Sequence, residues 1–436
     1  MGGRRGRDAV RGGGERVLNR GDSAARTAAG PRLPSGPDRP RLVAVADSES
    51  YLKWAARLLD RLGDFDTRLV LMDTPILPAA AQIEAATAGT SWAGRRPAVI
   101  GRRGLAALLT ELGPHIVLAA ATGPVVQQIH ATAARLRPRP GLVSGLPGVG
   151  LPATGKGARY RRLGDAFLTH SHREAAEYAR VYAGLRLPAE ILTTRLPMLE
   201  SQAPPAARGG ADGVRRLVFA PQAKVPVRRE QREAVLRALA AWAAAAPGRE
   251  AVVKLRSREG EQETHHEHVS YRELLAQLRA AGEAGPQVRE GYGPMSDFLT
   301  PSSALVTVSS TAALESLDRG LPTAIISDFG VDDEMLNEAF AGSGTERTLA
   351  QIAAGDLPFA SERWLEENYF HAEDGELERG LALLALRARE RQLPGLRRQA
   401  AMQDLRRVRA ELRTLAPAPV VRAYRAGAAA VRGLSR

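Results

Sequence analysis

The sequence contains no cysteine, and lysine and aromatic residues are scarce. Without cysteine, its 436 residues cannot form disulfides, cysteine nucleophiles, thiolate zinc sites or iron–sulfur clusters. Only four of the 61 basic residues are lysine, an arginine bias typical of a biased genome composition rather than of selection for phosphate contacts. Aromatic residues make up 5%, and no basic stretch is interleaved with them. This composition disfavours nucleic acid as a partner.

Long apolar runs are also missing. No stretch of about 18 consecutive apolar residues occurs, so no membrane-spanning helix is predicted. The Arg- and Gly-rich N-terminus has no apolar core of roughly 7–15 residues, so it does not resemble a secretory signal. We therefore expect cytoplasmic residence.

The formal charge of +13 is concentrated in two terminal segments. Residues 1–40 carry nine arginines against four acids (+5), and residues 381–436 carry thirteen against three (+10), which leaves 41–380 at −2. The C-terminal excess is suited to peripheral contact with anionic lipid at the inner face of the plasma membrane. A solvated, charged helix face explains it equally well.

The length and the pattern of apolar residues predict two α/β domains. Short apolar runs alternate with amphipathic segments from residue 41 to about 356, which indicates doubly wound parallel sheets with helices on both faces. The predicted units are a flexible Arg/Gly-rich segment (1–40), a Rossmann-like domain (41–200), a linker (201–213), a second Rossmann-like domain (214–356) and a helical basic tail (357–436).

The predicted elements follow from this alternation. Strands are expected at 41–46, 67–72, 97–101, 115–120, 141–144, 166–169 and 191–192, and then at 216–220, 251–255, 287–290, 304–308 and 323–327. Helices are expected at 51–62, 105–112, 125–136, 173–183, 232–246 and 271–280, with one or two more over 376–414, interrupted at Pro394-Gly395.

The sharpest candidate site follows the predicted strand 304–308. Ser309, Ser310 and Thr311 lead into a helix, and ligands of doubly wound sheets collect at the carboxyl ends of strands. Hydroxyls beside the N–H groups of a helix start suit a diphosphate, and Glu315, one turn further, suits ribose hydroxyls. Alternatively, Ser310 or Thr311 only caps the helix. A capping box places its acid three residues after the cap, whereas Glu315 follows Thr311 by four.

Further cations and acids follow neighbouring strands. Lys254 and Arg256 share one face of a strand end and could neutralise phosphate, and Lys224 follows the strand 216–220. Three histidines near His265 are too closely spaced for a zinc site, so no metal is predicted. His265 contacts phosphate or a leaving group, or lies in a solvated loop. Asp328 follows the strand 323–327, where it accepts hydrogen bonds from sugar hydroxyls or interacts favourably with a helix dipole.

The first domain supplies candidates for a general base. Asp47 and Glu49 follow its first strand, and His170 follows the strand 166–169. Helix capping is the alternative for Asp47. Residues 150–157 nearly form a phosphate-binding P-loop, but Gly157 stands where a serine or threonine would hold magnesium, which excludes ATP hydrolysis. The segment is instead predicted as a flexible loop that brings Lys156 to the cleft.

Several of these segments together resemble a known family. Lys254–Glu261, Thr264-His265, Val308–Pro322 and Asp328-Phe329-Gly330, with Leu146–Gly150 and Thr169–Glu174, resemble an actinobacterial family of GT-B-type glycosyltransferases. The resemblance covers roughly residues 41–345. It extends more distantly to capsule and polysialic-acid polymerases and glycerophosphotransferases.

The resemblance implies two Rossmann-like domains that face a cleft, with the nucleotide-sugar donor on the second and the acceptor on the first. Ser309, Ser310 and Thr311 match the donor-phosphate turn, and Glu315 matches a position on the following helix. The distant relatives have a His-Pro pair that Lys254-Leu-Arg256 lacks.

The predicted function is a metal-independent glycosyltransferase without a cofactor. It would transfer a sugar from a nucleotide sugar to an unknown acceptor, such as a cell-envelope glycan or a lipid-linked acceptor. A sugar-nucleotide epimerase on the same fold and a non-catalytic nucleotide-sugar-binding protein are alternatives, because fold alone does not decide activity.

Overall fold

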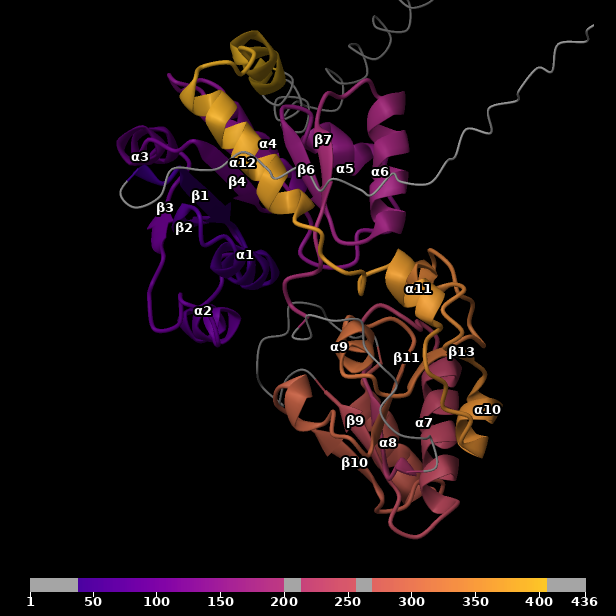
Figure 1. The fold of residues 1–436 in the computed structure, drawn as a ribbon. Coiled ribbons are helices and arrows are strands. Elements are labelled where there is room, and N and C mark those ends of the chain that lie inside the picture. The colour runs from indigo at the N-terminus through magenta and orange to yellow at the C-terminus, as the bar shows by residue number, and fades with distance from the viewer. Residues whose placement is uncertain (1–37, 200–212, 256–268, 406–436) are drawn as a thin grey trace, which may run out of the picture.

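The structure is a computed structural model that describes residues 38–199, 213–255 and 269–405. It contains two parallel α/β domains, one above the other in Figure 1. Most of the predicted flexible segment 1–40 and nearly all of the predicted linker 201–213 lie outside the described residues. No helix within the described ranges is both long and apolar enough to cross a membrane.

The first domain is built on a seven-stranded sheet with the order β3-β2-β1-β4-β5-β6-β7. Its strands are β1 (Arg41–Ala46), β2 (Asp66–Met72), β3 (Ala98–Ile100), β4 (Ile116–Ala120), β5 (Gly141–Ser144), β6 (Ala166–Thr169) and β7 (Glu190–Thr193). Its helices are α1 (Glu49–Arg61), α2 (Ala80–Thr87), α3 (Leu105–Leu112), α4 (Gly123–Ala133), α5 (Gly155–Tyr160) and α6 (His172–Gly184).

The second domain repeats the design on a six-stranded sheet with the order β10-β9-β8-β11-β12-β13. Its strands are β8 (Arg216–Phe219), β9 (Glu250–Lys254), β10 (Val288–Gly291), β11 (Ser303–Thr307), β12 (Thr323–Ile326) and β13 (Glu346–Arg347). Its helices are α7 (Arg229–Ala244), α8 (Tyr271–Ala280), α9 (Ala312–Asp318), α10 (Leu349–Ala354) and α11 (Glu362–Glu367).

Both sheets are doubly wound, which confirms the predicted fold class. All strand pairs of the two sheets are parallel, for example β1 with β4, where Ala46 lies opposite Ala120. The strand order reverses between β1 and β4 in the first sheet and between β8 and β11 in the second. These reversals are the switch points beside which α/β proteins of this kind bind ligands.

Five short elements were not predicted individually: α2, α5, α10, α11 and β13. The two residues of β13 are too few to show an alternating pattern, and the glycines of α5 hide its helical character. Thr154 starts α5 by accepting a hydrogen bond from the N–H of Gly157 at 3.1 Å. The flexible loop predicted around Lys156 is therefore wrong: Lys156 is an exposed residue in the first turn of a helix.

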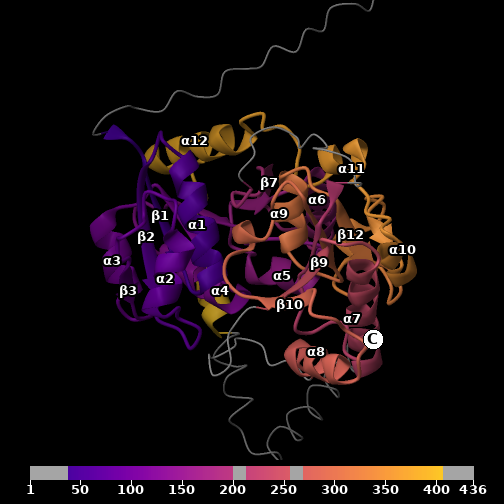
Figure 2. The ribbon, with the colours of Figure 1, turned by 90° about the horizontal axis from the view of Figure 1, so that it is seen from below.

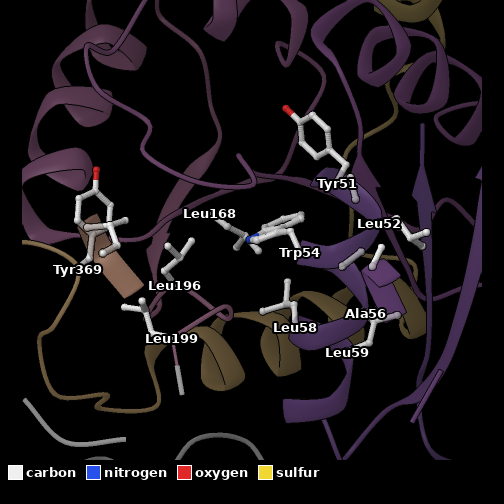
Figure 3. Close-up of a cluster of buried hydrophobic side chains, with 14 of the residues drawn as sticks. Tyr51, Leu52, Trp54, Ala56, Leu58, Leu59, Leu168, Leu196, Leu199 and Tyr369 are labelled. Carbon is white, nitrogen blue, oxygen red and sulfur yellow. The ribbon is translucent and has the colours of Figure 1, made fainter. Parts of the chain in front are cut away.

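The core of the first domain follows the two-residue period of its strands. In β1, Ala44 belongs to the cluster that also contains Trp54 of α1, whereas Val43 faces the opposite layer with Val126 of α4. Figure 3 shows Trp54 and other α1 side chains in the same cluster as Leu196, Leu199 and Tyr369. The cluster continues into the second domain through α9, so apolar contacts connect the two domains.

The C-terminal helix α12 (Glu376–Arg389) does not belong to a separate tail. It returns from the second domain and packs on strands of the first (Figures 1 and 2). Gly380 lies so close to Leu192 that a Cβ added to Gly380 would be 2.6 Å from Leu192 Cδ1. Leu384 likewise covers Gly141. The described part of the predicted tail 357–436 is helical, as expected, but α12 packs on the first domain. Sequence shows an amphipathic helix and not the surface that buries it. The chain is helical again from 397 to 405, after the predicted break.

Candidate functional site

Asp47 lies at the switch point of the first sheet. Thr122 follows β4, and Asp47 Oδ2 accepts hydrogen bonds from its backbone N–H (2.9 Å) and from its hydroxyl (2.6 Å). Its Oδ1 is buried and has no hydrogen-bond partner among the described residues. Ser48 is the N-cap of α1 and no side-chain hydrogen bond caps that helix, so Asp47 does not cap it. One carboxylate oxygen is thus fixed, and the other has no partner in the described chain although the residue is fully buried.

Tyr51 and Arg161 lie near Asp47. The Arg161 guanidinium, 5% exposed, donates to the carbonyl of Gly157 (3.1 Å) and to the Tyr51 hydroxyl (3.4 Å). Within the described ranges no carboxylate forms an ion pair with it. Burial raises the pKa of Tyr51, Arg161 opposes that rise, and Asp47 adds to it. The switch point therefore combines a carboxylate, a phenol and a buried guanidinium, of which the sequence had indicated only the carboxylate.

The other two candidate bases differ sharply in exposure. Glu49 is exposed in the first turn of α1. His170 is completely buried: its Nε2 accepts a hydrogen bond from Trp54 Nε1 (2.9 Å), and its Nδ1 lies 3.1 Å from the Thr194 carbonyl. Nε2 also lies 3.0 Å from the Leu146 carbonyl. Because Nε2 accepts the Trp54 proton, a neutral imidazole that carries its own proton on Nδ1 satisfies the Trp54 and Thr194 bonds. Both ring nitrogens are then occupied, so the geometry gives His170 a packing role and no free nitrogen for an acceptor.

Buried histidines should make the protein sensitive to acid. Burial lowers the pKa of both His130 and His170 to about 4, whereas an unfolded histidine titrates near 6.5. The unfolded state gains these protons first, so stability falls as pH drops from about 6.5 towards 4, by about 2 kcal/mol for each histidine. Urea unfolding at pH 7 and at pH 4.5 measures the loss. NMR titration of the two rings near pH 6.5 would contradict the assignment.

Glu174 anchors the loop between β5 and α5. Its Oε1 accepts hydrogen bonds from the N–H of Gly150 (2.6 Å) and the hydroxyl of Tyr369 (2.7 Å), and its Oε2 accepts one from the N–H of His170 (2.8 Å). Burial raises its pKa, and these hydrogen bonds oppose the rise. The Ser171-x-x-Glu174 spacing is that of a capping box, so sequence could have marked this residue, though not its partners.

The hydroxyl residues of the second domain lie directly after β11, as the sequence predicted. The Ser309 hydroxyl donates to the Leu336 carbonyl at 2.5 Å, and the Ser310 hydroxyl accepts from the N–H of Ala312 at 3.2 Å. Ser310 therefore satisfies the first N–H of α9, whereas the N-cap residue of that helix is Thr311 and no side-chain capping bond forms there. Thr311 is exposed and its side chain makes no hydrogen bond to the described part of the chain.

Glu315 lies four residues after Thr311, on the same side of α9. It is half-buried, and its carboxylate forms no hydrogen bond or ion pair with described residues. The first domain approaches this side of α9, because an added Cβ on Gly148 would lie 3.8 Å from Cγ2 of Thr311. Figure 1 shows α9 at the edge of the second domain that is nearest to the first. Thr311 and Glu315 are therefore available at the domain junction.

The remaining candidates are dispersed. Lys224 is exposed in the loop after β8, and its backbone N–H donates to Gln222 Oε1. Lys254 is half-buried at the end of β9. Asp328 accepts a hydrogen bond from the N–H of Leu349 at 2.7 Å, which occupies one oxygen at the start of α10. Arg256 and His265 lie outside the described residues.

A buried arginine shapes the loop that carries Lys224. Arg232 on α7 donates to the carbonyls of Ala223 (2.8 Å), Pro226 (2.9 Å) and Val269 (2.6 Å). These bonds fix both the loop after β8 and the chain that enters α8. No local pattern indicated this role, because Arg232 is one of several arginines in an amphipathic helix.

Among the residues that the structure describes, two ion pairs connect the domains. Arg195, after β7, pairs with Asp318 at the end of α9 at 3.2 Å, and both side chains are almost fully buried. Arg173 of α6 reaches Glu338 in the loop after β12 at 3.8 Å. Within the described ranges, no cluster of three or more His, Asp or Glu residues is arranged to hold a metal ion.

Two doubly wound domains with polar residues at the carboxyl ends of their strands define a GT-B-type α/β protein. The sequence matches, over residues 42–384, the family described as "Putative glycosyltransferase (DUF6716)". The chain belongs to this family, as the resemblance of its motifs had predicted. No curated protein sequence matches the chain.

Several solved structures have a similar fold. The UDP complex of MnaA from S. aureus is 10% identical with a TM-score of 0.50, over 80% of this chain and 94% of that one. The UDP-GlcNAc 2-epimerase from Methanocaldococcus jannaschii has the same identity and TM-score, over 79% and 99%. A "ugt transferase" from Siraitia grosvenorii in complex with UDP is 14% identical, with a TM-score of 0.46, over 83% and 99%. At these identities the likeness is one of fold.

Proposed function

We propose that the protein transfers a sugar from a nucleotide-sugar donor bound by the second domain to an acceptor held by the first. Membership of the glycosyltransferase family supports the class of reaction. The placement of the donor on the second domain rests on the domain junction. Thr311 and Glu315 lie on one side of α9, and Gly148 of the first domain approaches that side. The similar fold of MnaA, solved with UDP, supports a nucleotide as the ligand.

The donor would lie along the turn after β11. The Thr311 hydroxyl would donate to a phosphate oxygen, and the Glu315 carboxylate would accept hydrogen bonds from ribose hydroxyls, since neither group is used within the described chain. Lys224 and Lys254, on loops after neighbouring strands, would offset phosphate charge as the nucleotide leaves. Arg256, His265 and Asp328 remain candidates for the same site. With cations in this position, we infer transfer without a metal ion.

The first domain would supply the base. A general base must lie within hydrogen-bond distance of the acceptor hydroxyl from which it removes a proton. Asp47 fits this task best, because Thr122 fixes its Oδ2 while Oδ1 has no partner in the described chain. Thr74, in the exposed loop after β2, donates to the carbonyl of Asp47 at 3.2 Å. Movement of that loop would admit the acceptor, an envelope glycan or a lipid-linked sugar.

Titration calorimetry with UDP-, GDP-, TDP- and CMP-sugars, in buffer containing EDTA, tests the proposed donor class. Binding of one of these compounds without metal is expected. If none binds with or without magnesium, the nucleotide-sugar proposal is wrong; if magnesium is required, only the metal-independent part fails. Product analysis with and without an acceptor then separates the enzyme classes. Turnover of the bound sugar without acceptor would favour an epimerase, and binding without turnover would favour a non-catalytic protein.

Replacing Glu315 with alanine should weaken nucleotide binding by about tenfold, because each hydrogen bond to a charged group contributes roughly 1.5–3 kcal/mol. Glu230→Ala is the matched control: Glu230 is an exposed acid in the first turn of α7. Calorimetry with the nucleotide identified above measures both variants. Equal affinity for Glu315→Ala and the control would remove Glu315 from the site.

A further inference from the structure

A pocket of about 330 Å³ lies at the end of the first sheet opposite to the domain junction. It opens between α12 and the amino-terminal ends of β6 and β7, where Asp165 and Glu190 stand. Its apolar wall is formed by Leu383 and Leu384 of α12 and by Leu393 from the segment that follows. Its volume is at the lower end of the range of small-molecule sites. Neither the family resemblance nor the proposed transfer uses this pocket.

The mouth of the pocket is basic. Arg162 and Arg387 line it and are exposed, and an adjoining pocket of about 260 Å³, which shares Leu393, adds Arg137, Arg139 and Arg391. These five arginines face two acids, Asp165 and Glu190.

The charge of Asp165 is already offset. Arg139 binds it through two parallel hydrogen bonds of 2.8 and 2.9 Å, and both side chains are largely buried. Arg137, Arg387 and Arg391, by contrast, form no ion pair or side-chain hydrogen bond with described residues. The charges of Arg137, Arg387 and Arg391 are therefore not neutralised by ion pairs within the described chain, and Glu190 is the one other acid that lines the two pockets.

A basic rim above an apolar wall fits an amphipathic anion. A nucleic acid would supply the charge but no apolar chain, and the two pockets contain no aromatic side chain on which a base could stack. A phospholipid supplies both parts: its phosphate can lie between Arg387 and Arg391, and its acyl chain can lie against Leu383 and Leu393. Leu383 is 39% exposed, so an apolar surface is present at the mouth.

We propose that this pocket binds an anionic phospholipid of a bilayer and so holds the first domain on the membrane surface. The contact would involve the described body of the protein, in addition to any attraction from residues beyond 405. It lies at the amino-terminal ends of the strands, whereas Asp47 and Gly148 follow their carboxyl ends. Membrane contact here leaves the domain junction uncovered.

Co-sedimentation of the full-length protein with phosphatidylcholine vesicles, with and without phosphatidylglycerol, tests the proposal. Arg387→Glu combined with Arg391→Glu should reduce partition onto the anionic vesicles by at least about tenfold, since each arginine near such a surface is attracted to the anionic lipid. Arg102→Glu with Arg103→Glu is the matched control, because both are exposed first-domain residues and the charge change is the same. An equal reduction in both double variants would show that the overall charge of the protein attracts it to the vesicles, and the proposed lipid site would be wrong.

Leu383→Ser tests the apolar half at unchanged charge. It should weaken binding to the anionic vesicles severalfold, and binding unchanged by this substitution would overturn the lipid assignment. Binding of a DNA duplex is the further test. If the unmodified protein binds the duplex as tightly as the vesicles, and the Arg387/Arg391 double variant loses that binding, the site recognises polyanions in general and the lipid assignment is wrong. Calorimetry with nucleotide sugars should be unchanged in every variant, which separates this result from the fate of the proposed transfer.

Discussion

Replacing Asp47 with asparagine is expected to lower kcat for sugar transfer by roughly 10²–10⁴-fold, the range of a positioned general base. Asparagine keeps the size of the side chain and an oxygen to accept from Thr122, but it cannot take a proton from an acceptor hydroxyl. The fold should persist, because both Thr122 hydrogen bonds to this position can still form. Steady-state rates with saturating donor, together with the Tm of each protein, measure the effect.

Glu49→Gln is the control for this experiment, because Glu49 lies two residues further along and is exposed. Its rate should stay near that of the unmodified protein. If Glu49→Gln loses activity and Asp47→Asn does not, the base is Glu49. Full activity in both variants would remove the loop after β1 from the chemistry, and a lower Tm in Asp47→Asn alone would assign that residue a structural role.

Replacing Glu174 with alanine should destabilise the first domain by about 3–5 kcal/mol. The substitution leaves two buried backbone N–H groups and the Tyr369 hydroxyl without their acceptor. Each unsatisfied buried group costs about 1–3 kcal/mol. For a domain of this size the change corresponds to a fall in Tm of roughly 10 °C, which differential scanning calorimetry measures.

Glu177→Ala on the same helix is the matched control for Glu174→Ala. Glu177 is about one-quarter exposed, with one 3.5 Å hydrogen bond to the N–H of Ala153 and a 3.6 Å ion pair with Arg173. Its removal should change stability by less than about 1 kcal/mol. A similar fall in Tm for both variants would mean that helix propensity, not the buried hydrogen bonds, dominates.

The sequence was most informative about local structure. Buried parallel strands appear as short apolar runs, and β1, β5 and β6 lie where those runs predicted. The hydroxyl-rich turn before α9 was also recognisable, because a strand, a polar turn and an amphipathic helix follow one another within a few residues. These features depend on neighbours in the chain, so periodicity reveals them.

Contacts between distant segments were not predictable. Asp47 could be named as a candidate, but its bond to Thr122 joins residues 75 positions apart. His170 looked like a base after a strand, and only packing against Trp54 of α1 showed that its ring is enclosed. Arg161 stands among other arginines, and nothing local distinguishes the buried one.

The sequence by itself determined the two α/β units, the positions of most strands and the turns on which candidate residues lie, because hydrophobic periodicity and turn residues are local properties. Tertiary structure decided which of those residues are available. It enclosed His170, left one oxygen of Asp47 without a partner in the described chain, and brought Gly148 to Thr311 across the domain junction. It also returned α12 to the first domain, where arginines that had looked like part of a tail line an apolar pocket. Burial and proximity depend on how distant segments pack, and that information is not local to any segment of the sequence.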